Sequence, residues 1–183
     1  MSDSKILIAY YSRKGENYVG SRIVNLAVGN TEVAAKMVQE ITGGDIFEIC
    51  TVKSYPADYT ETTEVATIEK RANARPELST HVNNMDRYDT IILGYPNWWG
   101  TFPMAVFTFL EEYEFAGKTI LPFCTHEGSG LGGSERDIRK LCPGAKVLPG
   151  LAIRGAGVKG ANDANKSWIT KNKFNYQYGV KDC

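Results

Sequence analysis

Short apolar runs rich in β-branched residues alternate with segments of helical spacing along the chain. Apolar runs bounded by turn residues are typical of strands, and their alternation with helical patterns indicates βαβ units on a parallel sheet. The first, third and fourth runs are nearly continuous, as expected of strands that are covered by helices on both faces. The five predicted strands are Lys5–Ser12, Ile46–Val52, Thr90–Tyr95, Thr119–Thr125 and a weaker Lys146–Ile153.

Segments with helical spacing separate these runs. Apolar residues recur at helical intervals between Val33 and Ile41, and two glycines, Gly43 and Gly44, follow as a stop signal. Pro103 stands at the first position of a strongly apolar segment, where a helix tolerates proline. The predicted helices are Thr31–Ile41, Glu61–Asn73, Pro103–Tyr113, Ser134–Leu141 and Asn162–Lys173. The tail Asn172–Cys183 is polar and aromatic and gives no clear element.

This alternation predicts an α/β fold, a three-layer doubly wound five-stranded parallel sheet with strand order 2-1-3-4-5. No internal repeat or proline-rich linker interrupts it, so residues 1–183 are expected to form a single domain. In such sheets ligands bind beyond the carboxyl ends of the strands, at the point where the strand order reverses. The loops after the first, third and fourth strands are therefore the places to search for chemistry.

Composition and charge narrow the classes of function. The chain has 183 residues, 43% of them hydrophobic, which is typical of an ordinary globular domain. Lys plus Arg and Asp plus Glu each number 21, so the net charge is zero and no basic surface for nucleic acid is indicated. The early apolar run Ile6–Tyr11 is far shorter than the roughly 20 residues of a membrane span, and no signal-peptide pattern follows it. We expect a cytoplasmic protein without a membrane or nucleic-acid partner.

The four cysteines are widely spaced and form no C-x-x-C pair or Cys/His cluster. Neither a zinc site nor a dithiol redox site is therefore indicated, and no metal is expected. Buried, reduced thiols are the expected state of Cys50, Cys124, Cys142 and Cys183.

The loop after the first strand carries Ser12, Lys14, Asn17 and Tyr18 and leads to the segment Gly29–Glu32, which opens the first helix. Short hydroxyl and amide side chains with glycine before a helix N-terminus make a phosphate cradle, because unpaired N–H groups and the helix dipole face an anion there. An ordinary helix cap at Asn30 or Thr31 with a surface loop is the alternative. A Walker A loop is excluded, because its G-x-x-x-x-G-K-[ST] pattern does not occur.

The loop after the third strand contains two adjacent tryptophans, Trp98 and Trp99, between Pro96 and Gly100. A surface loop gains little from exposing large indoles, so a flat aromatic ligand would explain them. The alternative is that one or both indoles pack into the core beneath the loop, and even then the backbone of this loop could line the edge of a ligand.

The loop after the fourth strand, Thr125–Gly133, is rich in glycine and also carries His126 and Ser129. Glycines let the backbone approach a planar ring closely, and the polar side chains add donors. Its glycines match G-x-G-x-x-G, but the match follows the fourth strand and lacks the ribose-binding acid, so a dinucleotide fingerprint is rejected. An ordinary loop histidine is the alternative reading of His126.

Together these loops resemble those of the flavodoxins, in particular the clostridial-type branch of flavodoxin-like proteins. The resemblance rests on Ile6–Ser12, Gly29–Glu32, Tyr95–Gly100 and Thr125–Gly133. It implies a 2-1-3-4-5 sheet that binds FMN non-covalently, with the phosphate in the first loop and the isoalloxazine ring between the other two. The cofactor-binding residues that it implies are Ser12, Lys14, Asn17, Tyr18, Asn30, Thr31, Pro96, Asn97, Trp98, Trp99, Gly100, Thr125, His126, Glu127, Gly128, Ser129 and Gly130.

The chain departs from the flavodoxin pattern in two ways. About 17 residues, Arg13 to Gly29, are inserted between the strand's serine and the Gly-Asn-Thr-Glu segment, and the charge is neutral where the family is typically acidic. We further expect backbone hydrogen bonds from Pro96–Gly100 near the flavin N5, and a raised flavin potential if His126 is protonated.

The resemblance implies a low-potential electron-transfer protein that acts with redox partner proteins, as a monomer or weak homodimer. No residue needs to act as a catalytic acid or base, because flavin itself transfers the electrons. An NAD(P)H-dependent quinone or azo-compound reductase of the same fold is the main alternative. A domain that has lost its cofactor and serves as a binding module is a third possibility.

Overall fold

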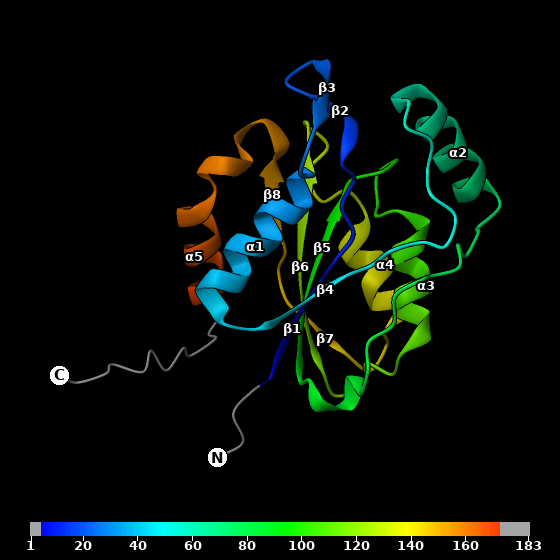
Figure 1. Cartoon of the computed structure of the whole chain (residues 1–183). Coiled ribbons are helices and arrows are strands. Elements are labelled where there is room, and N and C mark those ends of the chain that lie inside the picture. Colours follow the sequence, from blue (N-terminus) through cyan, green and yellow to red (C-terminus); the bar gives the residue numbers. More distant parts are fainter. Residues whose placement is uncertain (1–4, 173–183) are drawn as a thin grey trace.

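The computed structural model describes residues 5–172. Its centre is a parallel sheet in the order β4-β1-β5-β6-β7, with β8 also paired to β6 (Figure 1). The predicted order is confirmed, except that the fifth position is shared by two short strands. Pro149 and Gly150 separate these strands, and proline cannot donate to a sheet ladder. The strands of this sheet are β1 (Ile6–Tyr10), β4 (Asp45–Glu48), β5 (Thr90–Pro96), β6 (Thr119–His126), β7 (Lys146–Val147) and β8 (Leu151–Arg154).

Helices cover both faces of the sheet (Figure 1). On one face, α1 and α5 pack with β1, β5 and β6 around Val38 and Trp168, and on the other α3 and α4 pack around Phe109 and Ile138. Helix α2 lies at the side of the molecule, beyond α3. The helices are α1 (Asn30–Thr42), α2 (Tyr59–Arg71), α3 (Met104–Glu112), α4 (Ser134–Leu141) and α5 (Asn162–Lys171), with short 3₁₀ turns η1 (Met85–Arg87) and η2 (Gly155–Gly160). The predicted fold class is thereby confirmed.

Alternation along β1 explains why its sequence reads as one apolar run. Leu7 and Ala9 enter the core cluster under α3 and α4, whereas Ile8 and Tyr10 enter the cluster under α1 and α5. Because both faces are buried, successive side chains are all apolar although they point in opposite directions. Burial of Leu7 and of Ile8 each stabilises the fold by about 1.5–3 kcal/mol relative to an exposed side chain.

The second strand is shorter than predicted. β4 ends at Glu48, whereas the pattern suggested a strand to Val52. Beyond Glu48 the chain turns to a different partner, because the N–H of Val52 donates to the carbonyl of Glu77 and that of Ser79 donates to the carbonyl of Cys50. The apolar run therefore continues as irregular pairing outside the main sheet.

The inserted segment forms a β-hairpin for which the sequence analysis assigned no element. Strands β2 (Gly15–Val19) and β3 (Arg22–Leu26) pair in antiparallel register. Gly20 and Ser21 make the two-residue turn, and both have positive φ (57° and 72°), as the tight turns favoured in hairpins require. The hairpin stands above the carboxyl ends of the parallel strands, at the top of Figure 1.

Gly94 in the middle of β5 is predicted to be essential for packing. A Cβ there would lie 2.1 Å from Cζ of Phe123 on the adjacent strand β6, and that ring is fully buried. We expect Gly94→Ala to lower the free energy of unfolding by about 1–3 kcal/mol through overpacking, measured by urea unfolding. Gly157→Ala is the matched control, because a Cβ at Gly157 meets nothing within 4 Å. Equal stability of the two variants would contradict this account of the core.

Candidate functional site

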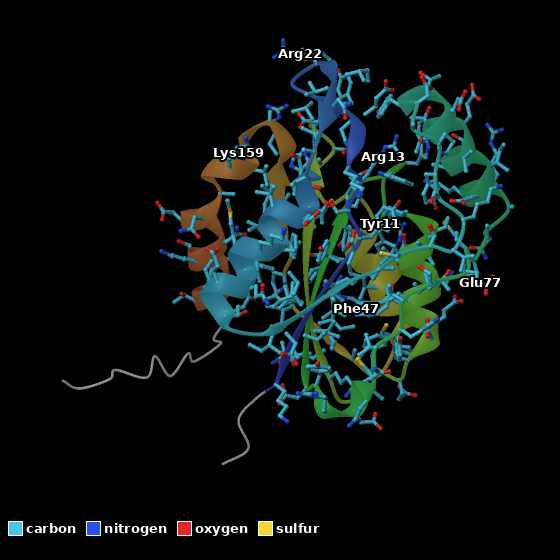
Figure 2. The ribbon with its side chains drawn as sticks, in the orientation of Figure 1. Tyr11, Arg13, Arg22, Phe47, Glu77 and Lys159 are labelled. Atoms are coloured by element: carbon cyan, nitrogen blue, oxygen red, sulfur yellow. The ribbon has the colours of Figure 1, made fainter. Side chains whose placement is uncertain are left out.

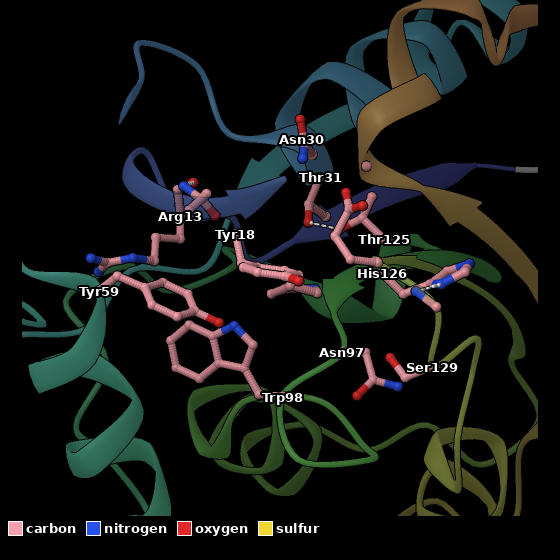
Figure 3. A pocket seen from close by; sticks show the side chains of 15 residues that line it. Arg13, Tyr18, Asn30, Thr31, Tyr59, Asn97, Trp98, Thr125, His126 and Ser129 are labelled. Atoms are coloured by element: carbon pink, nitrogen blue, oxygen red, sulfur yellow. Dashed lines mark hydrogen bonds between the residues drawn. The ribbon is translucent and has the colours of Figure 1, made fainter. Parts of the chain in front are cut away.

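An open cavity of about 320 Å³ lies at the carboxyl ends of β1, β5 and β6, beneath the hairpin (Figure 3). Its volume falls at the lower end of the range for small-molecule sites, about 300–1,000 Å³. The first turn of α1, the loops after β5 and β6, the hairpin and the start of α2 all contribute to its wall. The lining residues are Arg13, Asn17, Tyr18, Asn30, Thr31, Tyr59, Pro96, Asn97, Trp98, Thr125, His126, Glu127, Gly128, Ser129 and Gly155.

The first turn of α1 presents unpaired donors at this cavity. Gly29 is the N-cap and supplies no side chain, so Ser12 Oγ substitutes by accepting the N–H of Glu32 at 3.0 Å. The backbone N–H groups of Asn30 and Thr31 have no partner within residues 5–172, which is the usual state of a helix start open to a ligand. Gly29 is required sterically, because a Cβ there would lie 2.2 Å from Ser12 Oγ.

Two buried hydroxyl groups form the floor of the cavity. Thr31 Oγ1 and Thr125 Oγ1 lie 2.7 Å apart, and the two residues are only 2% and 4% exposed. Each hydroxyl carries one proton, and the hydrogen bond between them uses one of the two. The second proton has no protein acceptor within the described chain, so it is available to a ligand.

The two adjacent tryptophans occupy different environments. Trp98 lines the cavity and is held at ring-centroid distances of 5.5 Å from Tyr11 and 5.2 Å from Tyr55, in edge-to-face contacts. Trp99 has a φ of 54°, is 54% exposed and does not line this cavity. A positive φ is unusual for a bulky residue. Both readings made for the pair are thus partly met, since Trp98 packs under the loop and also faces the cavity.

The backbone of the loop after β5 is mostly engaged with the protein itself. The N–H groups of Asn97, Trp98 and Gly100 donate to Thr125 O, Thr101 O and Asn97 Oδ1, respectively. The expected backbone hydrogen bonds from Pro96–Gly100 to the flavin stay a prediction for the other groups of the loop, because these three donors are already used within the protein. The reason is that Asn97 cross-links the loop, and its Nδ2 also donates to Gly130 O in the loop after β6.

The loop after β6 packs directly on the loop after β5. The N–H of Gly133 donates to Gly100 O at 2.8 Å. A Cβ on Gly132, which has a φ of 55°, would lie 2.3 Å from that same oxygen. The glycines of this loop thus serve its contact with the neighbouring loop as well as the cavity.

His126 is held in its neutral form. Its Nδ1 accepts the N–H of Gly128 at 2.9 Å, so the proton of the neutral ring is on Nε2. Partial burial, and secondarily the positive charge of Arg154, lower the pKa of His126 from its ordinary value of 6.5, while Glu127 opposes the shift. The condition stated for a raised flavin potential, a protonated His126, is therefore disfavoured by the site.

The hairpin is fixed over the cavity by charged side chains. Glu127 accepts the N–H of Gly20 at the hairpin turn and, with its other oxygen, the N–H of Ala156. On the opposite side Glu16 accepts the N–H of Tyr59 at the start of α2 at 2.7 Å. The rings of Tyr18 and Tyr59 stack with centroids 6.4 Å apart, as Figure 3 shows. Helix α2 and the hairpin therefore form one continuous wall.

Most residues that the sequence analysis singled out line the cavity, and five do not. Ser12 lies behind it as the cap of α1, and Lys14 is exposed on the hairpin stem. Trp99, Gly100 and Gly130 belong to the two loops but are not on the cavity wall. Three further residues line the cavity without having been predicted to do so, Arg13, Tyr59 and Gly155. Arg13 adjoins the predicted phosphate loop and could have been included, whereas nothing in the local sequence connects Tyr59 or Gly155 to this site.

Comparison with known proteins agrees with this geometry. The flavodoxin family model matches residues 5–172, nearly the whole chain. The chain belongs to the flavodoxin family. A candidate flavoprotein from Bacteroides uniformis ATCC 8492 is 31% identical, with a TM-score of 0.75 over 92% of this chain and 99% of that one. A similar protein from Bacteroides eggerthii DSM 20697 is 28% identical, with a TM-score of 0.75 over 92% and 98%.

A more distant relative has been solved with its ligand. The flavoprotein from Lactobacillus acidophilus NCFM in complex with FMN is 22% identical, with a TM-score of 0.62 over 88% of this chain and 98% of that one. At this identity the likeness concerns the fold of the flavodoxin family. Comparison with curated proteins gives no match.

The remaining expectations concern metals, membranes and thiols. Within residues 5–172 of this flavodoxin-family chain, no group of three His, Cys, Asp or Glu side chains could hold a metal ion. Nor is any helix of that part long and apolar enough to cross a membrane.

Cys124 and Cys142 are buried free thiols, and burial raises the pKa of each to about 12. Cys50 is a half-buried free thiol. Cys183 and most of the tail for which no element was assigned lie outside the described residues.

The state of His126 in this flavodoxin-family protein can be tested by NMR titration of its ring protons. We expect a pKa below 6.5, and Arg154→Gln should raise it towards that value by removing the neighbouring positive charge. Arg139→Gln is the control, since Arg139 pairs with Glu135 on α4 and is not among the causes of the shift. A wild-type pKa above 6.5 would show that Glu127 dominates instead.

Proposed function

We propose that the protein binds FMN non-covalently in the 320 Å³ cavity and works as an electron-transfer flavodoxin. The observation that carries the proposal is the combination, in one cavity, of unpaired donors at one end and a fixed indole at the other. FMN has the matching parts, an anionic phosphate and a flat aromatic ring system. Family membership supports the same cofactor.

The donor set fits a phosphate group. The N–H groups of Asn30 and Thr31, the surplus hydroxyl proton of the Thr31 and Thr125 pair and the positive end of the α1 dipole all favour an anion. Glu127 lies in the same wall, but its two oxygens already accept backbone N–H groups, which offset its charge. Phosphate binding is thereby assigned to Asn30, Thr31 and Thr125, with Ser12 holding the helix start in place.

The opposite end fits an aromatic ring. Trp98 offers a large apolar surface whose orientation is fixed by Tyr11 and Tyr55, so little conformational entropy is lost on stacking. Asn97 fixes the distance between the loops after β5 and β6 through its bond to Gly130 O. The width of the ring site thus depends on Asn97, whose Oδ1 and one Nδ2 proton are used within the two loops.

The protein's part in electron transfer is electrostatic. Bound FMN would supply the redox chemistry, because flavin accepts and donates one or two electrons. Neutral His126 and the carboxylate of Glu127 add no positive charge at the cavity wall, and partial burial disfavours added negative charge further. These features support a low potential, whereas the positive charge of Arg13 on the opposite wall raises it. Flavin itself carries the electrons, so the site supports transfer to a partner protein without a catalytic residue.

A reductase that takes electrons from NAD(P)H is the second candidate. The observation in its favour is a smaller cavity that shares Trp98, Tyr59 and Arg13 with the first. A carrier needs only an exposed edge of its cofactor, whereas a reductase needs room beside it for a second small molecule.

Trp98 is predicted to contribute to FMN affinity and Trp99 is not. Trp98→Ala should weaken FMN binding about tenfold, or shift the flavin potential, through loss of a stacking surface. Trp99→Ala should leave FMN affinity within about twofold, because this neighbouring indole lies outside the cavity. Fluorescence titration of the cofactor-free proteins with FMN measures the FMN affinity of both variants. Wild-type FMN affinity together with a wild-type flavin potential in Trp98→Ala would exclude the stacking role.

Absorbance spectra of the FMN-loaded protein separate the two candidate functions. For a carrier, we expect flavin bands that dithionite bleaches and that NADPH leaves unchanged over minutes. Rapid bleaching by NADPH would identify a reductase instead. Failure to take up FMN at all would overturn both and favour a binding module of the same fold.

A further inference from the structure

A second cavity of about 170 Å³ opens beside the proposed FMN site, between the hairpin stem, helix α2 and the loop after β5. Arg13, Asn17, Tyr59, Asn97 and Trp98 line both cavities, so the two are contiguous. The remaining wall comes chiefly from the α2 face at Thr62 and Thr63 and from Trp99. A molecule in this space would lie next to whatever occupies the larger cavity.

The wall of the second cavity is aromatic. Tyr59, Trp98 and Trp99 contribute three large flat side chains to it. Trp99 is 54% exposed, and its position here accounts for an indole that the larger cavity does not use. Exposed aromatic surface next to a pocket gains free energy when a flat ligand covers it.

Arg13 gives this cavity its one charged lining residue. Its Nε donates to Glu16 O and its Nη2 to the carbonyls of Pro56 and Ala57, which fix the guanidinium in place. No carboxylate of residues 5–172 forms an ion pair with it, because the Glu16 side chain bonds the N–H of Tyr59 instead. In Figure 3 the guanidinium extends towards Tyr59 and away from Asn30 and Thr31. Its positive charge is therefore half-buried, fixed and unneutralised, on the side remote from the proposed phosphate site.

We propose that this second cavity is an acceptor subsite for a planar quinoid molecule that carries a sulfonate or carboxylate. The ring lies against Tyr59 and the two indoles, and the anionic group pairs with Arg13 through a charge-assisted hydrogen bond. In the reaction the quinone gains two electrons and two protons and becomes the hydroquinone, while reduced FMN loses the same and becomes oxidised FMN. The inference rests on the proposed FMN binding and adds a small-molecule acceptor to it.

The test uses oxidised, FMN-loaded protein and calorimetric titration with anthraquinone-2-sulfonate, compared with the neutral 2-(hydroxymethyl)anthraquinone. We expect the sulfonate to bind at least tenfold more tightly than the neutral compound. Arg13→Gln should remove this preference and leave the neutral compound unaffected. Arg22→Gln removes a cation at the exposed tip of the same hairpin (Figure 2). It should change neither the affinity for the sulfonate nor the affinity for the neutral compound.

A second pair of variants blocks the space itself. Thr63→Phe should abolish binding of both anthraquinones without changing FMN affinity, because Thr63 lines the second cavity and not the first. Thr60→Phe, on an exposed position of the same helix, should leave the affinities for both anthraquinones and for FMN unchanged. Retention of anthraquinone binding in Thr63→Phe would overturn the subsite.

Arg13 also anchors the hairpin, so a purely structural role must be distinguishable. Arg13→Lys keeps the charge but not the hydrogen bonds of the guanidinium. Recovery of the sulfonate preference in Arg13→Lys supports the charge pairing. A preference equally lost in Arg13→Gln and Arg13→Lys, or a loss of FMN affinity in Arg13→Gln as large as the loss of sulfonate affinity, would overturn it. Absence of FMN binding in the wild-type protein would overturn the proposed function and, with it, the acceptor subsite.

Discussion

The cavity depends on how the first turn of α1 is held against the ends of β1 and β6. Ser12 at the end of β1 accepts a helix N–H, and Thr31 on the helix bonds Thr125 at the end of β6. These two bonds leave the N–H groups of Asn30 and Thr31 and one hydroxyl proton without partners among residues 5–172. Buried or half-buried donors are costly unless they are paired, by about 1–3 kcal/mol each. An anionic ligand that accepts hydrogen bonds from these donors would remove this cost. Ligand binding would therefore also stabilise the first turn of α1.

The hairpin is the chief departure from the family pattern and the element on which the shape of the site depends. A two-stranded hairpin is marginally stable alone in water. Here Glu127 fastens its turn to the loop after β6, while Arg13 and Glu16 fasten its stem to the start of α2. The insertion thus joins two regions that are far apart in sequence. It adds a wall above the carboxyl ends of the parallel strands and so forms the larger cavity and the second cavity beside it.

The sequence predicted the fold where burial alone determines local structure. β1, β5 and β6 are buried on both faces, so their apolar runs mark them, and α4 was placed at its observed bounds, Ser134–Leu141. The hairpin could not be predicted in this way, because Tyr18 and Ile23 are exposed and its stability comes from distant polar contacts. The same holds for Tyr59, which reaches the cavity only because Glu16 binds the start of α2. The differing roles of two adjacent tryptophans likewise depend on a single backbone φ, which no sequence pattern reveals.

Charge is distributed asymmetrically across the site although the chain as a whole is neutral. At the loop after β6, His126 is neutral and Glu127 is negative, while Arg154 brings a positive charge close to His126. At the opposite wall Arg13 carries a fixed positive charge with no ion-pair partner within the described chain. Arg13 also lines the larger cavity, so its positive charge acts both on an anionic acceptor beside it and on the proposed cofactor. The placement of these opposite charges around the cavity, which overall composition does not reveal, thus determines both the electrostatics of the proposed cofactor and the preference for an anionic acceptor.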